Sequence, residues 1–181
     1  MALAAAPLAW AQSAAPKLDV PYLPTTESAV EAMLKLGGVK SADVVYDLGC
    51  GDGRIVIAAA KLFGAHGVGI DIDPQRIAEA NANAKKAGVE KLVKFQEADL
   101  FKADIHEASV VTLFLLSSVN LKLRPKLVSD LKPGTRIVSN TFDMGDWQPA
   151  QELDLGGSED NYFSRKLMLW IVPERGDRGK K

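Results

Sequence analysis

The sequence predicts an α/β domain in which about seven strands form a doubly wound sheet, mostly parallel with an antiparallel closing strand, and helices cover both faces. Beyond residue 18, strand-like and helix-like segments alternate along the chain. A glycine-rich turn, DLGCGDGR at residues 47–54, separates the first strand from its helix. Hydrophobic residues make up 47% of the 181 residues and charged residues 25%, as in ordinary globular domains. Such alternation implies right-handed crossovers and a parallel sheet that is buried on both faces.

The domain is expected to begin with a helix. Val30, Met33 and Leu34 fall on one helical face. Ser28-x-x-Glu31 has the form of a capping box at the start of this helix, and two consecutive glycines are expected to end it. Residues 43–47, DVVYD, then form a short buried strand that runs into the glycine-rich turn.

Two further units of helix and strand follow the turn. Residues 54–63, RIVIAAAKLF, are apolar on most sides, as expected for a helix packed on a sheet. The second strand is expected at residues 67–72. Asp73 is placed to cap a helix that starts at Pro74 and runs to about residue 87. Residues 91–97 form the third strand of this part.

The carboxyl-terminal half is expected to complete the sheet. Residues 109–116, SVVTLFLL, form an apolar fourth strand, and a helix follows to about residue 131. The fifth strand is expected at residues 136–140. Residues 151–155 and 166–172 are expected to close the sheet in antiparallel arrangement.

One domain is predicted, at residues 19–175, between an apolar leader at 1–18 and a polar tail at 176–181. Ala9-Trp10-Ala11 in the leader has the small-x-small form of a signal-peptidase site, but the first basic residue is Lys17. Three interpretations stay open for the leader: an export signal, a short membrane-association segment, or a disordered alanine-rich stretch.

Composition argues against several kinds of site. Cys50 is the only cysteine, so an intramolecular disulfide and a cysteine-based zinc cluster are excluded. With only His66 and His106 as histidines, no metal site is expected. The formal net charge of -1 gives no broad basic surface, so nucleic acid is not expected as a partner. No apolar run reaches the roughly 20 residues that span a bilayer.

The glycine-rich turn lies where doubly wound sheets bind nucleoside ligands. A dinucleotide fingerprint would need glycine at position 54, where this chain has Arg54. The carboxylates of Asp47 and Asp52 would repel a pyrophosphate at the helix N-terminus. A cationic, phosphate-free nucleoside fits this turn better, and the expected cofactor is S-adenosylmethionine.

Acidic residues after the second and third strands extend the expected cofactor site. Asp71 ends the second strand, where the carboxylate of a dinucleotide-binding fold accepts hydrogen bonds from the ribose hydroxyls. Asp99 follows the third strand and is placed to accept from the adenine amino group, while Leu100 is placed to pack on the base. These residues fall at carboxyl ends of successive strands, so we expect them to lie together with Asp47 at one edge of the sheet.

The motifs DLGCGDGR, GVGIDID and EADLF together resemble those of class I, seven-stranded S-adenosylmethionine-dependent methyltransferases, which have a Rossmann-like fold. PYLPT at 21–25, LLSSVN at 115–120 and GTRIVS at 134–139 are similar to the lysine methyltransferases of the ATP synthase c subunit and the adenine nucleotide translocase, and to their prokaryotic relatives. The resemblance implies a protein-lysine methyltransferase that acts on a membrane protein. The cofactor contacts that it implies are Tyr22, Thr25, Asp47, Gly49, Gly51, Asp71 and Asp99.

The methyl acceptor is expected to lie after the fourth and fifth strands. Asn120 or Asp143 is placed to orient an amine, and Phe142 and Trp147 are placed to form an aromatic wall, whereas core packing is favoured for Phe114. A small-molecule methyltransferase and a non-catalytic nucleoside-binding module remain alternatives. The need for the cofactor favours a cytoplasmic or membrane-associated protein, with export as the alternative.

Overall fold

The computed structural model describes residues 23–156 and 166–174 of the chain, so the leader, Tyr22 and the tail lie outside the described residues. The strands and helices agree in kind and order with those expected from the sequence. In chain order they are α1 (Glu27–Leu36), β1 (Val44–Leu48), α2 (Arg54–Phe63), β2 (His66–Asp71), α3 (Pro74–Ala87), β3 (Val93–Glu97), β4 (Val110–Leu113), α4 (Ser117–Asp130), β5 (Arg136–Asn140), β6 (Gln151–Asp154) and β7 (Lys166–Ile171).

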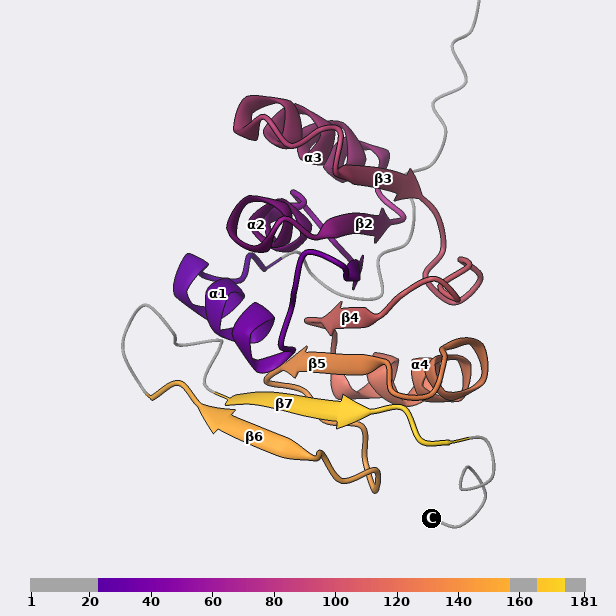
Figure 1. The fold of residues 1–181 in the computed structure, drawn as a ribbon. Helices are drawn as coiled ribbons and strands as arrows, with labels where there is room; N and C mark the ends of the chain where they lie inside the picture. Colours follow the sequence, from indigo (N-terminus) through magenta and orange to yellow (C-terminus); the bar gives the residue numbers. More distant parts are fainter. Residues whose placement is uncertain (1–22, 157–165, 175–181) are drawn as a thin grey trace, which may run out of the picture.

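Seven strands form one sheet in the order β3-β2-β1-β4-β5-β7-β6 (Figure 1). The pairings among β1 to β5 are parallel. β7 runs antiparallel to both β5 and β6, so it alone reverses direction among the described strands. The predicted fold class, a mostly parallel doubly wound sheet, is confirmed.

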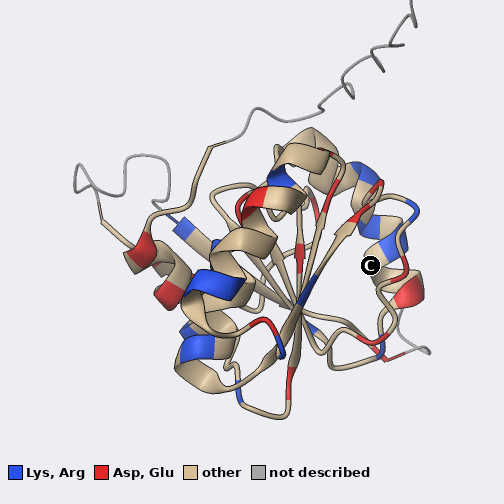
Figure 2. Cartoon of the chain, turned by 90° about the horizontal axis from the view of Figure 1, so that it is seen from above, with Lys and Arg blue, Asp and Glu red and all other residues tan. Residues whose placement is uncertain are grey.

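The sheet separates two apolar cores, and helices lie on both sides of the stacked strands in Figure 2. Val45 and Val110 belong to the core that contains Met33 of α1, Val56 of α2 and Ala84 of α3. Their neighbours Tyr46 and Val111 belong to the other core, which contains the apolar side chains of α4. Consecutive residues of one strand reach opposite cores because side chains alternate along a strand. No helix among the described residues is long and apolar enough to cross a membrane.

Several expected boundaries are wrong by one to three residues, such as the start of β3 at Val93 in place of residue 91, and two of them have a clear structural cause. The Oγ1 atom of Thr26 accepts from the backbone N–H of Ala29 at 3.3 Å, so Thr26 caps α1 in place of Ser28. β4 ends at Leu113, three residues before the predicted end of that strand. The apolar run continues to residue 116 because Phe114 and Leu115 line a cleft after the strand has ended.

Gly53, the N-cap residue of α2, has no room for a side chain. A Cβ atom there would lie 2.6 Å from Cε1 of Phe95 and 2.9 Å from Cβ of Ala80. Gly88, the C-cap residue of α3, offers a matched control: its φ is 71° against 80° at Gly53, but nothing lies within 4 Å of its Cβ position.

We expect Gly53→Ala to destabilise the protein more than Gly88→Ala in urea unfolding. Left-handed backbone costs alanine about 1–2 kcal/mol at either position. Overpacking adds about 1–3 kcal/mol at Gly53 alone. Equal losses in the free energy of unfolding would contradict the close packing of α2 on α3 and β3.

Candidate active site

The turn between β1 and α2 is curled by glycines with left-handed backbone. The φ angle is 84° at Gly49 and 51° at Gly51, values that residues with a Cβ atom rarely adopt. The N–H groups of Gly49 and Cys50 both donate to the carbonyl of Ile70 in β2, at 2.8 and 2.9 Å. The turn is therefore held over the end of β2, and both glycines line the cleft at this edge of the sheet.

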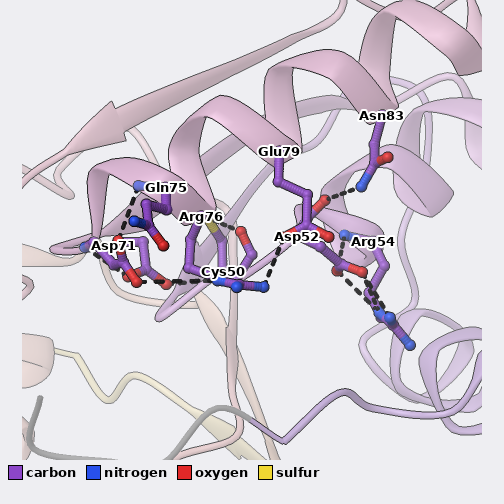
Figure 3. A network of polar contacts seen from close by, with 10 residues as sticks. Cys50, Asp52, Arg54, Asp71, Gln75, Arg76, Glu79 and Asn83 are labelled. Atoms are coloured by element: carbon purple, nitrogen blue, oxygen red, sulfur yellow. Dashed lines mark hydrogen bonds and ion pairs between the residues drawn. The ribbon is translucent and has the colours of Figure 1, made fainter.

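Asp71, the last residue of β2, joins this turn to the start of α3. Its Oδ2 atom accepts from the N–H of Gly51 at 2.9 Å, and its Oδ1 atom accepts from the N–H of Asp73 at 3.0 Å (Figure 3). An ionised carboxylate has about four lone-pair sites, so these two bonds leave acceptor capacity for a ligand. The assignment of Asp71 to the ribose hydroxyls stays a prediction, and the geometry is compatible with it.

Asp47 places a buried carboxyl group at the base of the cleft. The residue is 3% exposed, and its Oδ1 atom accepts from Oγ1 of Thr112 in β4 at 2.7 Å. Burial raises the pKa of Asp47 to about 7, against the lowering effect of the Thr112 hydrogen bond, and the negative charges of Asp71 and Asp52 add to the rise. A cation bound beside Asp47 would relieve this cost of ionisation.

Asp99 and Leu100 lie after β3 and line the same cleft. Oδ1 of Asp99 accepts from the N–H of Phe101 at 2.9 Å, and its Oδ2 atom lies 3.3 Å from Nζ of Lys102. The N–H of Ala98 donates to the carbonyl of Asp71 at 2.9 Å, which ties this loop to the end of β2. The loop therefore brings an acceptor and an apolar side chain to the expected adenine position.

The cleft has a volume of about 140 Å³ and contains every cofactor residue expected from the sequence that the structure describes. These residues are Thr25, Asp47, Gly49, Gly51, Asp71, Asp99 and Leu100.

Aspartates outnumber arginines in the lining, five to two: Asp47, Asp52, Asp71, Asp73 and Asp99 against Arg54 and Arg76. The arginines form ion pairs, Arg54 with Asp52 and Arg76 with Glu79, each at 2.6 Å. This acidic lining fits a ligand with a sulfonium, an ammonium and ribose hydroxyls. Its negative charge would repel a pyrophosphate. Among the described residues, no three or more histidine, cysteine or acidic side chains are arranged so that they could hold a metal ion.

Asn120 lies in α4, and the structure gives it contacts with the protein rather than with the cleft. Its side chain is fully buried, and its Nδ2 atom donates to the carbonyls of Phe142 and Asp143 at 3.1 and 3.3 Å. Its Oδ1 atom is a buried acceptor with no hydrogen-bond partner among the residues that the structure describes. The amide nitrogen of Asn120 therefore holds the loop after β5, and its contact with an acceptor amine stays a prediction.

Asp143 and Trp147, which were also expected at the acceptor, lie outside the cleft lining. Asp143 is exposed, and its Oδ1 atom accepts from the N–H of Gly145 at 3.0 Å. Trp147 is buried against Trp170, with ring centroids 6.3 Å apart, and its carbonyl accepts from the indole N–H of Trp170 at 2.7 Å. Trp147 therefore belongs to the core under α4, and the expected aromatic wall of Phe142 and Trp147 is not formed.

A different aromatic pair stands at this end of the cleft. Phe114, for which core packing was favoured, lines the cleft, and its ring stacks on that of Phe142 with centroids 5.9 Å apart and an interplanar angle of 30°. Leu115 and Val119 continue the apolar lining beside Phe114. Sequence reasoning did not assign Leu115, Val119 or Thr112 to the site, although the polar Thr112 within an apolar strand was a usable signal.

Comparisons with known proteins identify the family. A model of the ANTKMT methyltransferase domain matches residues 47–151. A Saccharolobus islandicus protein described as a protein-lysine N-methyltransferase is 46% identical over 86% of this chain and 95% of its own length. The adenine nucleotide translocase lysine N-methyltransferase of Mus musculus is 35% identical over 87% of this chain and 73% of its own.

A solved structure agrees with this result. The crystal structure of a Salinibacter ruber protein described as an RNA methyltransferase, in complex with S-adenosyl-L-homocysteine, matches 84% of this chain and 95% of its own chain. The two are 53% identical and superpose with a TM-score of 0.80. The chain therefore belongs to the ANTKMT family of S-adenosylmethionine-dependent methyltransferases.

Proposed function

We propose that this protein transfers the methyl group of S-adenosylmethionine to the ε-amino group of lysine in a protein substrate. The observation that carries the proposal is that the lining of one cleft changes from acidic to apolar along its length. Its end over β1 and β2 is acidic, while its end after β4 is lined by Phe114, Leu115 and Val119. The name of the Saccharolobus islandicus relative supports lysine as the acceptor.

The apolar end suits a lysine that must lose its charge before it reacts. A free lysine has a pKa near 10.4, and only the neutral amine is nucleophilic. Apolar walls lower the pKa of a bound lysine because burial disfavours the charged form. When bound, S-adenosylmethionine supplies the electrophilic methyl group. The protein therefore has to bind, orient and desolvate, and this mechanism needs no strong base beside the acceptor.

The residues of the acidic end divide the binding of the donor between them. We assign Asp47 to the positive charge of the cofactor and Asp71 to its ribose hydroxyls, and both residues line the cleft. Asp99 and Leu100 serve the adenine. Gly49 and Gly51 leave room for a close approach of the ligand to the backbone.

We also propose a membrane protein as the target. A human relative, named as the lysine N-methyltransferase of the ATP synthase c subunit, is 33% identical over 74% of this chain. This enzyme and the mouse relative are named for the ATP synthase c subunit and the adenine nucleotide translocase, and the family resemblance of the sequence motifs implies a membrane protein as the target. The apolar wall beside Phe114 would accept a lysine stem that emerges from an apolar segment.

RNA is the second candidate acceptor because the Salinibacter ruber relative is described as an RNA methyltransferase. The charge of this chain argues against it. Proteins that bind RNA neutralise phosphates with lysine and arginine. Here the formal net charge is -1, and the cleft lining holds five aspartates against two arginines that are already in ion pairs.

The test is transfer of a radiolabelled methyl group from S-adenosylmethionine to membrane and soluble extracts. We expect label that protease removes and ribonuclease does not, and that is recovered as methyl-lysine after acid hydrolysis. Label that ribonuclease removes would replace the lysine proposal with the RNA one. Label found only in small metabolites would contradict both.

We expect Phe142→Ala to raise the KM for the acceptor about three- to tenfold, because a stacked aromatic pair contributes about 0.5–1.5 kcal/mol. The dissociation constant for S-adenosylhomocysteine should change little, since Phe142 is not part of the cleft lining around Asp47 and Asp71. Leu62→Ala, at a side chain that is 57% exposed on α2, is the control. A weaker cofactor affinity with an unchanged KM for the acceptor would contradict the role given to this pair.

A further inference from the structure

Arg54 occupies the position at which a dinucleotide fingerprint would have its third glycine, and its side chain turns back onto the glycine-rich turn. Nε of Arg54 donates to Oδ1 of Asp52 at 2.9 Å, and Nη2 donates to Oδ2 at 2.6 Å. Two parallel hydrogen bonds of this kind fix the plane of the guanidinium group. The pair is partly shielded from water, with the Arg54 side chain 35% and the Asp52 side chain 13% exposed.

The third nitrogen of the guanidinium group contacts a segment that is distant in sequence. Nη1 of Arg54 donates to the backbone carbonyl of Thr25 at 2.7 Å. Thr25 is buried, and it lines the cofactor cleft together with Leu23 and Pro24. Arg54 therefore connects the turn that holds the cofactor with the segment, residues 23–25, that forms another wall of the same cleft.

Asp52, which holds the Arg54 side chain, is itself held by further hydrogen bonds. The carbonyl of Asp52 accepts from Nδ2 of Asn83 in α3 at 3.0 Å, and Oδ1 of Asp52 also accepts from the N–H of Arg54 at 3.3 Å (Figure 3). Asp52 is thus held from α3 and from the first residue of α2. A rigid anchor allows one guanidinium to set the position of residues 23–25.

We propose that Arg54 is a positioning residue: the Asp52–Arg54 pair latches residues 23–25 against the glycine-rich turn, and retention of S-adenosylmethionine depends on this latch. Ordering a loop on ligand binding costs free energy, and a loop that is ordered beforehand avoids that cost. Loss of the latch should therefore weaken binding of the cofactor. The inference rests on S-adenosylmethionine as the cofactor, and it is independent of the identity of the acceptor.

The decisive comparison is Arg54→Lys against Arg54→Ala. Lysine keeps the positive charge but cannot hold both oxygens of Asp52 and the Thr25 carbonyl with one fork. We expect both variants to bind S-adenosylhomocysteine about tenfold more weakly in calorimetry, since hydrogen bonds to charged groups are among the stronger ones. Activity at saturating S-adenosylmethionine should stay within about twofold, so that the effect falls on KM for the cofactor and not on kcat.

Hydrogen–deuterium exchange of residues 23–30 supplies a readout that does not depend on activity. The N–H groups of Ala29 and Val30 are bonded to Thr26, next to the latched carbonyl. We expect faster exchange of this peptide in both Arg54 variants without ligand. Arg76→Ala removes a second positive charge from the cleft lining, but its ion pair with Glu79 lies within α3. That control should leave exchange of residues 23–30 unchanged.

Several outcomes overturn the latch. If Arg54→Lys matches the wild type in affinity and exchange, then the charge alone matters and the latch is wrong. If circular dichroism shows that the Arg54 variants do not fold, Asp52→Asn serves instead, and unchanged exchange of residues 23–30 in that folded variant overturns the proposal. Failure of the wild type to bind S-adenosylhomocysteine would instead refute the cofactor site itself.

Discussion

Replacing Asp71 with alanine is expected to weaken S-adenosylhomocysteine binding by about 100-fold or more. The carboxylate accepts from the N–H groups of Gly51 and Asp73, so the change loosens two turns that line the cleft. It also removes the acceptor expected for the ribose hydroxyls. Hydrogen bonds to a charged group contribute about 1.5–3 kcal/mol each. Losing two of them would cost about 3 kcal/mol or more, which corresponds to a loss of affinity of at least about 100-fold.

Isothermal titration calorimetry measures this change, with Glu90→Ala as the control for loss of an exposed carboxylate. Asp71→Asn should fall between wild type and Asp71→Ala, because the amide keeps one acceptor oxygen. An Asp71→Ala protein that is folded and binds within about twofold of the wild type would show that the ribose lies elsewhere.

The second large effect is a pH dependence of cofactor binding that comes from Asp47. With a pKa of about 7 in the ligand-free protein, this carboxyl is mostly neutral at pH 6 and mostly ionised at pH 8. A cationic ligand binds the ionised form better, so the affinity for S-adenosylmethionine should rise as the pH rises, by up to about tenfold per unit below pH 7, and level off above it. Calorimetry in buffers of different ionisation enthalpy should detect the proton that is released on binding.

The free energy of unfolding of the ligand-free protein should change with pH in the opposite direction to the cofactor affinity. The pKa of Asp47 is raised from its usual value near 4, so between pH 4 and 7 the folded state binds more protons than the unfolded state. The free energy of unfolding therefore falls as the pH rises through this window, by on the order of a few kcal/mol. Asp47→Asn removes this titration, and both profiles should flatten. A variant whose profiles match those of the wild type would contradict the assignment to Asp47.

The order of strands and helices could be predicted because local sequence carries it. The run DVVYD and the apolar segment 54–63 are short-range patterns that indicate a strand and a helix. The glycines between them indicate a turn. Apolar character alone could not place the end of β4, because Phe114 is an apolar residue that lines a cleft beyond the end of the strand. Hydrophobic patterning cannot tell a side chain that lines a pocket from one in a buried strand.

The gathering of the expected cofactor residues in one cleft could be predicted because parallel strands bring their carboxyl ends to one edge of a sheet. Asp47, Asp71 and Asp99 are far apart in sequence, yet the fold collects them in one cleft. The positions of the residues expected at the acceptor could not be predicted in the same way. Trp147 pairs with Trp170, and Asn120 holds the loop after β5, through contacts between distant segments that no local pattern reveals.

The most direct test of the acidic cleft is a crystal structure of the protein with S-adenosylhomocysteine. The ribose hydroxyls should lie within hydrogen-bond distance of Asp71, with the sulfur over the Gly49–Gly51 turn and the adenine beside Asp99. A ligand bound at any other place, or one whose ribose makes no contact with Asp71, would contradict the account.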